Sequence, residues 1–196
     1  MLYGICSRVI QSAVEGGLIS MEATEEYVYG LELTISAIIS YVTVIAIGFM
    51  MHMPLEAAMF LIIYTTLRRY VGGFHFNSQL VCYLSNYFIC PAVLLAVKYL
   101  GFNAVFYSII ISLSSLLLWL SAPIPSANKP LDDKEKKIYR LVSRLMIAFV
   151  CVVFFICLNI SIWVSKIITI SVFVVAVFAV IGIINLRVRK KYQGQQ

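Results

Sequence analysis

The stretch FNAVFYSIIISLSSLLLWLSA, residues Phe102–Ala122, contains no charged side chain and decides the class of fold. A helix needs about 20 consecutive apolar residues to cross the hydrocarbon core of a bilayer, and this run supplies them. The whole chain is similarly apolar, because 62% of its 196 residues are hydrophobic and only 12% are charged. Soluble domains average about 45–50% and about 25% for these two fractions. The composition therefore predicts an integral membrane protein.

Other apolar blocks resemble Phe102–Ala122 in length, and their charges lie near their ends. They are Leu31–Met53, Gln79–Leu100, Arg144–Trp163 and Ile167–Leu186. The shorter block Pro54–Leu67 would cover about 20 Å of a core about 30 Å thick, so we expect either a tilted span or a re-entrant helix. Since only helices and closed barrels satisfy the backbone in lipid, the blocks predict an all-α polytopic helical bundle with five to six membrane segments.

The N-terminal region differs from these blocks. Apolar residues between Leu2 and Val14 recur at i, i+3 and i+4, which predicts an amphipathic helix in the membrane interface. Gly16 and Gly17 are expected to end this helix, and Ser20 to cap the next one. Residues 1–30 hold several glutamates and no compact apolar core, so a cleavable signal peptide is not expected.

The net charge of +6 is informative mainly through its location. Basic residues gather at Arg68-Arg69, in the loop between Ala122 and Arg144, and in the tail after Leu186. The positive-inside rule places all three clusters, and the C-terminus, in the cytoplasm. Because this charge lies on membrane loops, a nucleic-acid partner is not expected.

We interpret residues 1–196 as one membrane domain with five parts. These are an amphipathic cytoplasmic region at 1–30, the first membrane segments at 31–122 with a reactive segment at 67–87, a cytoplasmic loop at 123–143, a helical hairpin at 144–186 and a basic tail at 187–196. Three prolines exclude a regular helix from the start of the loop. Asp132 followed by Glu135 predicts a capping box for the helix that enters the next span.

The reactive segment reads LRRYVGGFHFNSQLVCYLSNY, Leu67–Tyr87. A cysteine thiolate is a nucleophile, and an imidazole can accept its proton, so His75 and Cys82 are the right residue types for a catalytic pair. On one continuous helix they would lie about 10.5 Å apart along the axis, beyond hydrogen-bond reach. Gly72-Gly73 permits a break, after which Asn77 or Ser78 can cap a new helix with Cys82 in its second turn.

Structural interpretations of the same residues remain open at this point. A histidine beside a membrane segment often serves as an interfacial hydrogen-bonding group, and Arg68-Arg69 is either a topology anchor or a site for an acidic substrate. The other cysteines have no histidine nearby and are interpreted as packing residues. They are Cys6, Cys90, Cys151 and Cys157. The odd number of cysteines argues against a disulfide framework, and no metal-ligand spacing is visible, so no cofactor or metal is expected.

Two motifs resemble a known family. RRYVGGFHFNSQLVC, Arg68–Cys82, resembles the signature of the accessory gene regulator B family of bacterial membrane peptidases, and APIPSANKPL, Ala122–Leu131, is similar to that family's second marker. The resemblance covers essentially the whole chain. It implies a cysteine endopeptidase of the bacterial cell membrane with its active site at the cytoplasmic face. Such an enzyme cleaves a short precursor peptide through an acyl-enzyme thioester and allows cyclisation to a thiolactone or lactone pheromone.

By motif position, the resemblance implies that Cys82 is the nucleophile and His75 its base, with Arg68 and Gly73 in supporting positions. It supplies no orienting residue, for which Asn77, Ser78 and Asn86 are the candidates.

The partners implied are a short precursor with an amphipathic N-terminal segment and the lipid bilayer. A homodimer is compatible with the sequence, although no residue argues for it. A peptide exporter without covalent catalysis is the alternative function, and a membrane scaffold a third. The later spans, however, offer few polar residues to line a path, and no ATP-binding loop is visible.

Overall fold

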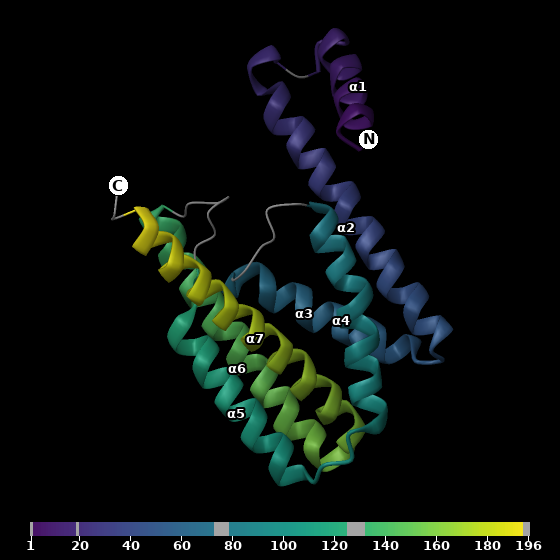
Figure 1. Cartoon of the computed structure of the whole chain (residues 1–196), viewed down its shortest axis with the longest axis vertical. Helices are drawn as coiled ribbons and strands as arrows, with labels where there is room; N and C mark the ends of the chain where they lie inside the picture. Colours follow the sequence, from purple (N-terminus) through teal and green to yellow (C-terminus); the bar gives the residue numbers. More distant parts are fainter. Residues whose placement is uncertain (1, 19, 73–78, 125–131, 194–196) are drawn as a thin grey trace. The chain divides into compact units, whose positions relative to one another are not determined.

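The computed structural model describes residues 2–18, 20–72, 79–124 and 132–193, and Figure 1 shows them as a set of helices. The elements are α1 Leu2–Glu15, a 3-10 turn Met21–Ala23, α2 Thr24–Met50, α3 Pro54–Val71, α4 Gln79–Tyr99, α5 Ala104–Ser121, α6 Asp133–Ile160 and α7 Ile162–Gln193. No strand occurs in these residues beyond one isolated backbone bridge. The predicted all-α class is confirmed.

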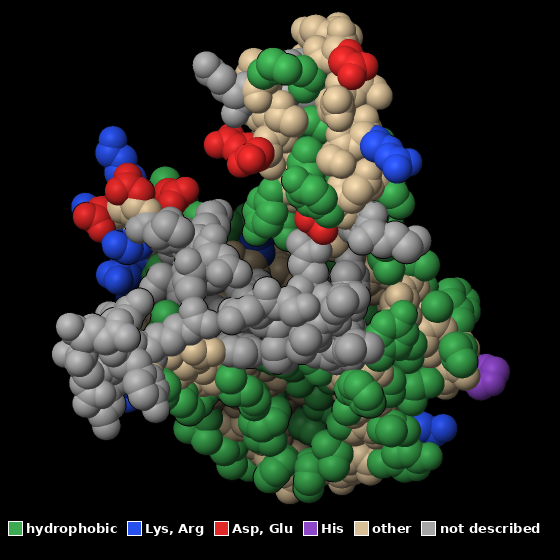
Figure 2. Space-filling model, turned by 45° about the horizontal axis from the view of Figure 1, so that its top comes forward, with side chains coloured by type: hydrophobic (Ala, Val, Ile, Leu, Met, Phe, Trp, Pro, Cys, Tyr) green, Lys and Arg blue, Asp and Glu red, His purple; other side chains and the backbone are tan. Residues whose placement is uncertain are grey.

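Within the described ranges, four helices are long and apolar enough to cross a membrane. They are α2, α5, α6 and the part of α7 from Ile162 to Val188. Leu113, Leu120 and Phe149 illustrate the exposed side chains of this region, which are apolar and 63%, 74% and 65% exposed. Figure 2 shows hydrophobic side chains over much of the visible surface. Such a surface suits lipid as the solvent, so the chain is a multi-pass membrane protein.

Residues Met1–Thr43 form a compact unit of their own. Cys6 and Ile10 of α1 are buried together with Val28 of α2, so α1 packs its apolar stripe against the start of α2. Gly17, at φ 72°, follows the end of α1, and its N–H donates to the Val14 carbonyl at 2.9 Å, as expected for a glycine terminator. The prediction for Ser20 is wrong: its side chain makes no cap bond, because a 3-10 turn intervenes before α2.

Residues Val44–Gln196 form the second unit, and α7 is its central helix. In Figure 1, α5, α6 and α7 run side by side, and α3 and α4 also pack against α7. Val172, Val175 and Ala179 of α7 are buried at helical spacing, in one core with Leu67 of α3 and Ile111 of α5. This core fixes the position of the α3 C-terminus, where the reactive segment begins.

The short block at Pro54 is one continuous helix that extends to Val71. Its 18 residues span about 27 Å, close to the thickness of a bilayer core. A helix that returned to the same membrane face would need a turn inside this length. α3 is thus unbroken, but it is not one of the four helices in the described ranges whose length and composition suit a membrane crossing.

The capping box predicted for the loop is present and starts α6 at Asp133, eleven residues before Arg144. The Asp132 carboxylate accepts from the Asp133 N–H at 2.7 Å, and Glu135 accepts from the Asp132 N–H at 3.1 Å. The Lys136 ammonium, 2.9 Å from Asp133, lowers the pKa of that carboxyl through its hydrogen bond and charge. Much of the predicted loop is therefore the first part of α6.

Candidate active site

The described helices do not run continuously through the reactive segment. α3 ends at Val71, and α4 begins at Gln79. Gly72 has φ 76° and ψ −150°, a conformation that residues with a side chain rarely adopt. α3 therefore does not continue through Gly72 into α4. Gly73, His75, Asn77 and Ser78 lie outside the described residues.

Cys82 is the fourth residue of α4. With 3.6 residues per turn, this position lies where the first turn passes into the second, and the expected caps Asn77 and Ser78 are not among the described residues. Backbone N–H groups without a helical partner and the helix dipole make such a position favourable for a thiolate. Asn86 follows one turn later. The described part of α4 here is its backbone, so the side chains of Cys82 and Asn86 are not placed.

A contact between distant segments joins the two family-like motifs. The Ile124 N–H donates to the Val71 carbonyl at 2.8 Å, and Ile124 pairs with Gly72 in a parallel backbone bridge. The start of the proline-rich motif therefore lies against the end of α3. A Cβ at Gly72 would collide with the Ile124 carbonyl oxygen. Glycine is thus required at position 72 for two reasons. Its backbone angle is one that other residues rarely adopt, and the backbone of Ile124 leaves no room for a side chain.

Gly72→Ala is expected to destabilise this junction. A positive φ at a residue with a side chain costs on the order of 1–3 kcal/mol, and the new methyl group must also displace Ile124. The measurement is the thermal midpoint in detergent, together with protease cleavage between residues 72 and 79. Gly101→Ala is the matched control, because a Cβ at Gly101 meets nothing within 4 Å. Equal midpoints and equal proteolysis for the two variants would show that the junction does not need glycine.

Arg68 supports the same junction from within α3. Its Nη1 donates to the Gly72 carbonyl at 3.1 Å, and its guanidinium lies 5.1 Å from the centroid of the Phe178 ring of α7. Tyr64 also contacts Phe178, with ring centroids 6.3 Å apart. Arg68 is half-buried, whereas Arg69 is exposed. An intramolecular bracing role was not among the sequence interpretations of Arg68.

Sequence reasoning missed Ile124 and Phe178 as neighbours of the reactive segment. Phe178 is one apolar residue within a long apolar span, and Ile124 contributes a backbone N–H that any residue except proline would supply. Neither position therefore carries a residue-type signal. The remaining signal was indirect, namely the occurrence of both motifs in one chain.

Comparisons with known proteins agree with the motif resemblance. The family model for accessory gene regulator B matches residues 6–183. A protein of Clostridium perfringens (strain SM101 / Type A) described as AgrB-like is 31% identical over 123 residues, which cover 59% of this chain and 58% of the relative. A second AgrB-like protein, from C. perfringens (strain 13 / Type A), is 28% identical over the same shares. The chain thus spans somewhat more than half the length of each relative. No solved structure matches.

Proposed function

Because this chain belongs to the accessory gene regulator B family, and so takes part in processing a quorum-sensing peptide, we propose that it is a membrane-embedded cysteine endopeptidase. Its substrate is a short pheromone precursor, from which it removes the C-terminal part. The helix break at Gly72 is the structural observation that carries this proposal. At this break α3 ends ahead of the reactive segment, and α4 starts at Gln79, so the two are not one continuous helix.

The proposed reaction begins when His75 takes the proton of the Cys82 thiol. The thiolate attacks the carbonyl carbon of the scissile peptide bond, a C–S bond forms, and the C–N bond breaks as the imidazolium protonates the leaving amine. The precursor remains attached as a thioester. A thiol or hydroxyl within the same peptide then attacks the thioester carbonyl, closes a thiolactone or lactone ring and releases Cys82. Hydrolysis would lose this activation, so a site that limits water favours the product.

The supporting residues are proposed to position the chain where α3 ends at Gly72. Arg68 is a positioning residue in this proposal, because its hydrogen bond to the Gly72 carbonyl and its contact with Phe178 brace the end of α3. Gly73 is proposed as a supporting residue by its motif position alone. Asn77, Ser78 and Asn86 are the residues from which an orienting partner for His75 would come.

We propose that this site lies at the cytoplasmic face of the cell membrane. The contact of Ile124 with Val71 and the ring contact of Tyr70 with Tyr139, at 5.7 Å, hold the end of α3 beside the start of α6. Arg68-Arg69 and the lysines that begin α6 therefore lie at one end of the bundle. The positive-inside rule assigns this end, and the C-terminus of α7, to the cytoplasm. Its positive charge suits a precursor with acidic residues, whose amphipathic segment would lie in the bilayer.

The test is a covalent intermediate. The chain is reconstituted in vesicles and mixed with the labelled peptide encoded by a short neighbouring reading frame. The expected results are release of the C-terminal fragment and a mass increase of the chain equal to the remaining part of the peptide. Hydroxylamine should remove this adduct, because it cleaves thioesters. Movement of intact peptide across the vesicle membrane without cleavage would instead favour the exporter.

No observation in the described part of the chain favours that exporter. The buried hydroxyls of α7 bond to their own helix: Thr169 donates to the Ser165 carbonyl at 2.8 Å and Ser171 to the Ile167 carbonyl at 2.7 Å. These groups are already satisfied, so they offer no polar path to a transported peptide.

A further inference from the structure

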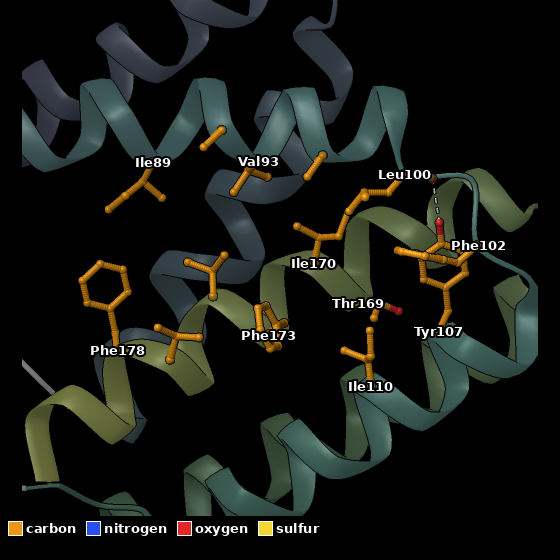
Figure 3. Close-up of a pocket in the computed structure, with 14 residues that line it drawn as sticks. Ile89, Val93, Leu100, Phe102, Tyr107, Ile110, Thr169, Ile170, Phe173 and Phe178 are labelled. Atoms are coloured by element: carbon orange, nitrogen blue, oxygen red, sulfur yellow. Dashed lines mark hydrogen bonds between the residues drawn. The ribbon is translucent and has the colours of Figure 1, made fainter. Parts of the chain in front are cut away.

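A cavity of about 400 Å³ lies between α4, α5 and α7. Figure 3 shows Ile89 and Phe178 at one end of it and Leu100, Phe102 and Tyr107 at the other. Of the residues that line it, only Tyr107 and Thr169 carry a polar atom in the side chain. Two of the helices that line it, α5 and α7, are long and apolar enough to cross a membrane.

Both hydroxyl groups in the lining already donate a hydrogen bond to a backbone carbonyl. The Tyr107 hydroxyl donates to the Leu100 carbonyl at 2.9 Å, and Thr169 donates to the Ser165 carbonyl within its own helix. Water in a cavity needs two to four polar partners, and an extended peptide would lose backbone hydrogen bonds there. The lining therefore excludes water and peptide backbone and suits an occupant without polar atoms.

The length of the cavity fits half a bilayer. From Ile89 to its end at Tyr99, next to Leu100, α4 advances by ten residues, which corresponds to about 15 Å. One leaflet contributes about 15 Å of hydrocarbon to a core about 30 Å thick. A single lipid tail that enters near Leu100 would therefore fill the cavity down to Ile89 and Phe178. An apolar cavity of this size would destabilise the fold if it stayed empty, because the side chains that line it would lose van der Waals contacts.

Lysines occur at the Leu100 end of the cavity. Lys98 is exposed and precedes Leu100 by two residues, and Lys166 precedes Thr169 by three. Figure 1 shows the end of α4 and the beginning of α7 at the same end of the bundle. Residues 98–110 and 160–170 contain no acidic residue, whereas the start of α3, which packs against Val97 and Ile167, carries Glu56. Each lysine adds positive charge at this end of the bundle, which favours an anionic lipid headgroup there.

We propose that the cavity binds one acyl chain of an anionic phospholipid, with the phosphate of that lipid at Lys98 and Lys166. The tail would connect α4 to α5 and α7 and so complete the packing of the helix that carries Cys82. This site is separate from the peptidase proposal, and its test does not depend on activity.

The test uses a phosphatidylglycerol with a diazirine in the middle of one acyl chain, in vesicles that contain the full chain. Photolysis should label cavity residues such as Val93, Ile170 and Phe173. Ala96→Phe fills the cavity and should abolish this labelling. Ala148→Phe is the matched control, because Ala148 is exposed on α6 and does not line the cavity, and it should leave the labelling intact.

A second pair of variants keeps the test decisive if Ala96→Phe fails to fold. Lys98→Gln and Lys166→Gln should each lower labelling of the cavity about fivefold, since a cation near anionic lipid contributes about that factor. Arg187→Gln, at the other end of α7, should not. Labelling confined to exposed faces, or unchanged by the lysine variants, would overturn the proposal. Displacement of the probe by the precursor peptide, or by a second copy of the chain, would overturn it in favour of that occupant.

Discussion

Cys82→Ala is expected to abolish both release of the C-terminal fragment and the covalent adduct. Without the sulfur, no thioester can form, and the residual rate should fall below detection because the nucleophile supplies the whole pathway. Cys82→Ser should retain at most a trace, since a hydroxyl is a far weaker nucleophile than a thiolate near neutral pH. Fragment release is measured by mass spectrometry, and folding by the elution profile in detergent.

Cys90→Ala is the matched control on the same helix. Cys90 is 1% exposed, and its sulfur faces the Val44 carbonyl at 3.9 Å, so it packs in the core rather than at the helix start. Cys151 likewise bonds to Ser115 at 3.2 Å. Full activity in Cys82→Ala, or an adduct that moves to Cys90, would end the assignment of Cys82 as the nucleophile.

The sequence predicted most helices because the bilayer restricts the choices. The apolar block Phe102–Ala122 became α5 with ends shifted by only a few residues, since a span must satisfy its backbone internally. Charged or polar turns extend α2, α6 and α7 beyond their predicted blocks, because hydropathy does not mark where a helix continues out of the membrane. The Asp132 cap was also local, because one carboxylate and one nearby N–H are enough to define it. Ser20 shows the limit of this reasoning, since a short 3-10 turn used the same residues differently.

The parts of the site that the sequence did not predict depend on long-range packing. Ile124 meets Gly72 across about fifty residues, through backbone atoms that leave no side-chain signature. The contact of Arg68 with Phe178 depends on the relative rotation of α3 and α7, which hydropathy does not encode. The cavity between α4 and α7 has the same origin. Residue types indicated a catalytic pair, and the fold added the neighbours that would hold it.

His75→Gln is expected to slow formation of the acyl-enzyme by a factor of about 10² to 10⁴ at pH 7, the usual contribution of a positioned general base. Glutamine keeps a hydrogen-bonding side chain of similar size but cannot accept a proton at this pH. The rate is measured from the growth of the adduct in a single turnover. His52→Gln is the control, because His52, the other histidine of the chain, is exposed at the turn between α2 and α3.

The pH dependence separates a base from a structural role. In the absence of His75, the reaction depends on spontaneous ionisation of Cys82, and a free thiol has a pKa of about 8.5. The rate of His75→Gln should therefore rise steeply as the pH increases through this value, while the unmodified chain, with its base available at lower pH, should gain much less. A variant that had only lost structure would stay inactive at every pH. Equal inactivity at pH 7 and pH 9 would therefore remove His75 from the proposed mechanism, because the thiolate would be present at the higher pH and still fail to react.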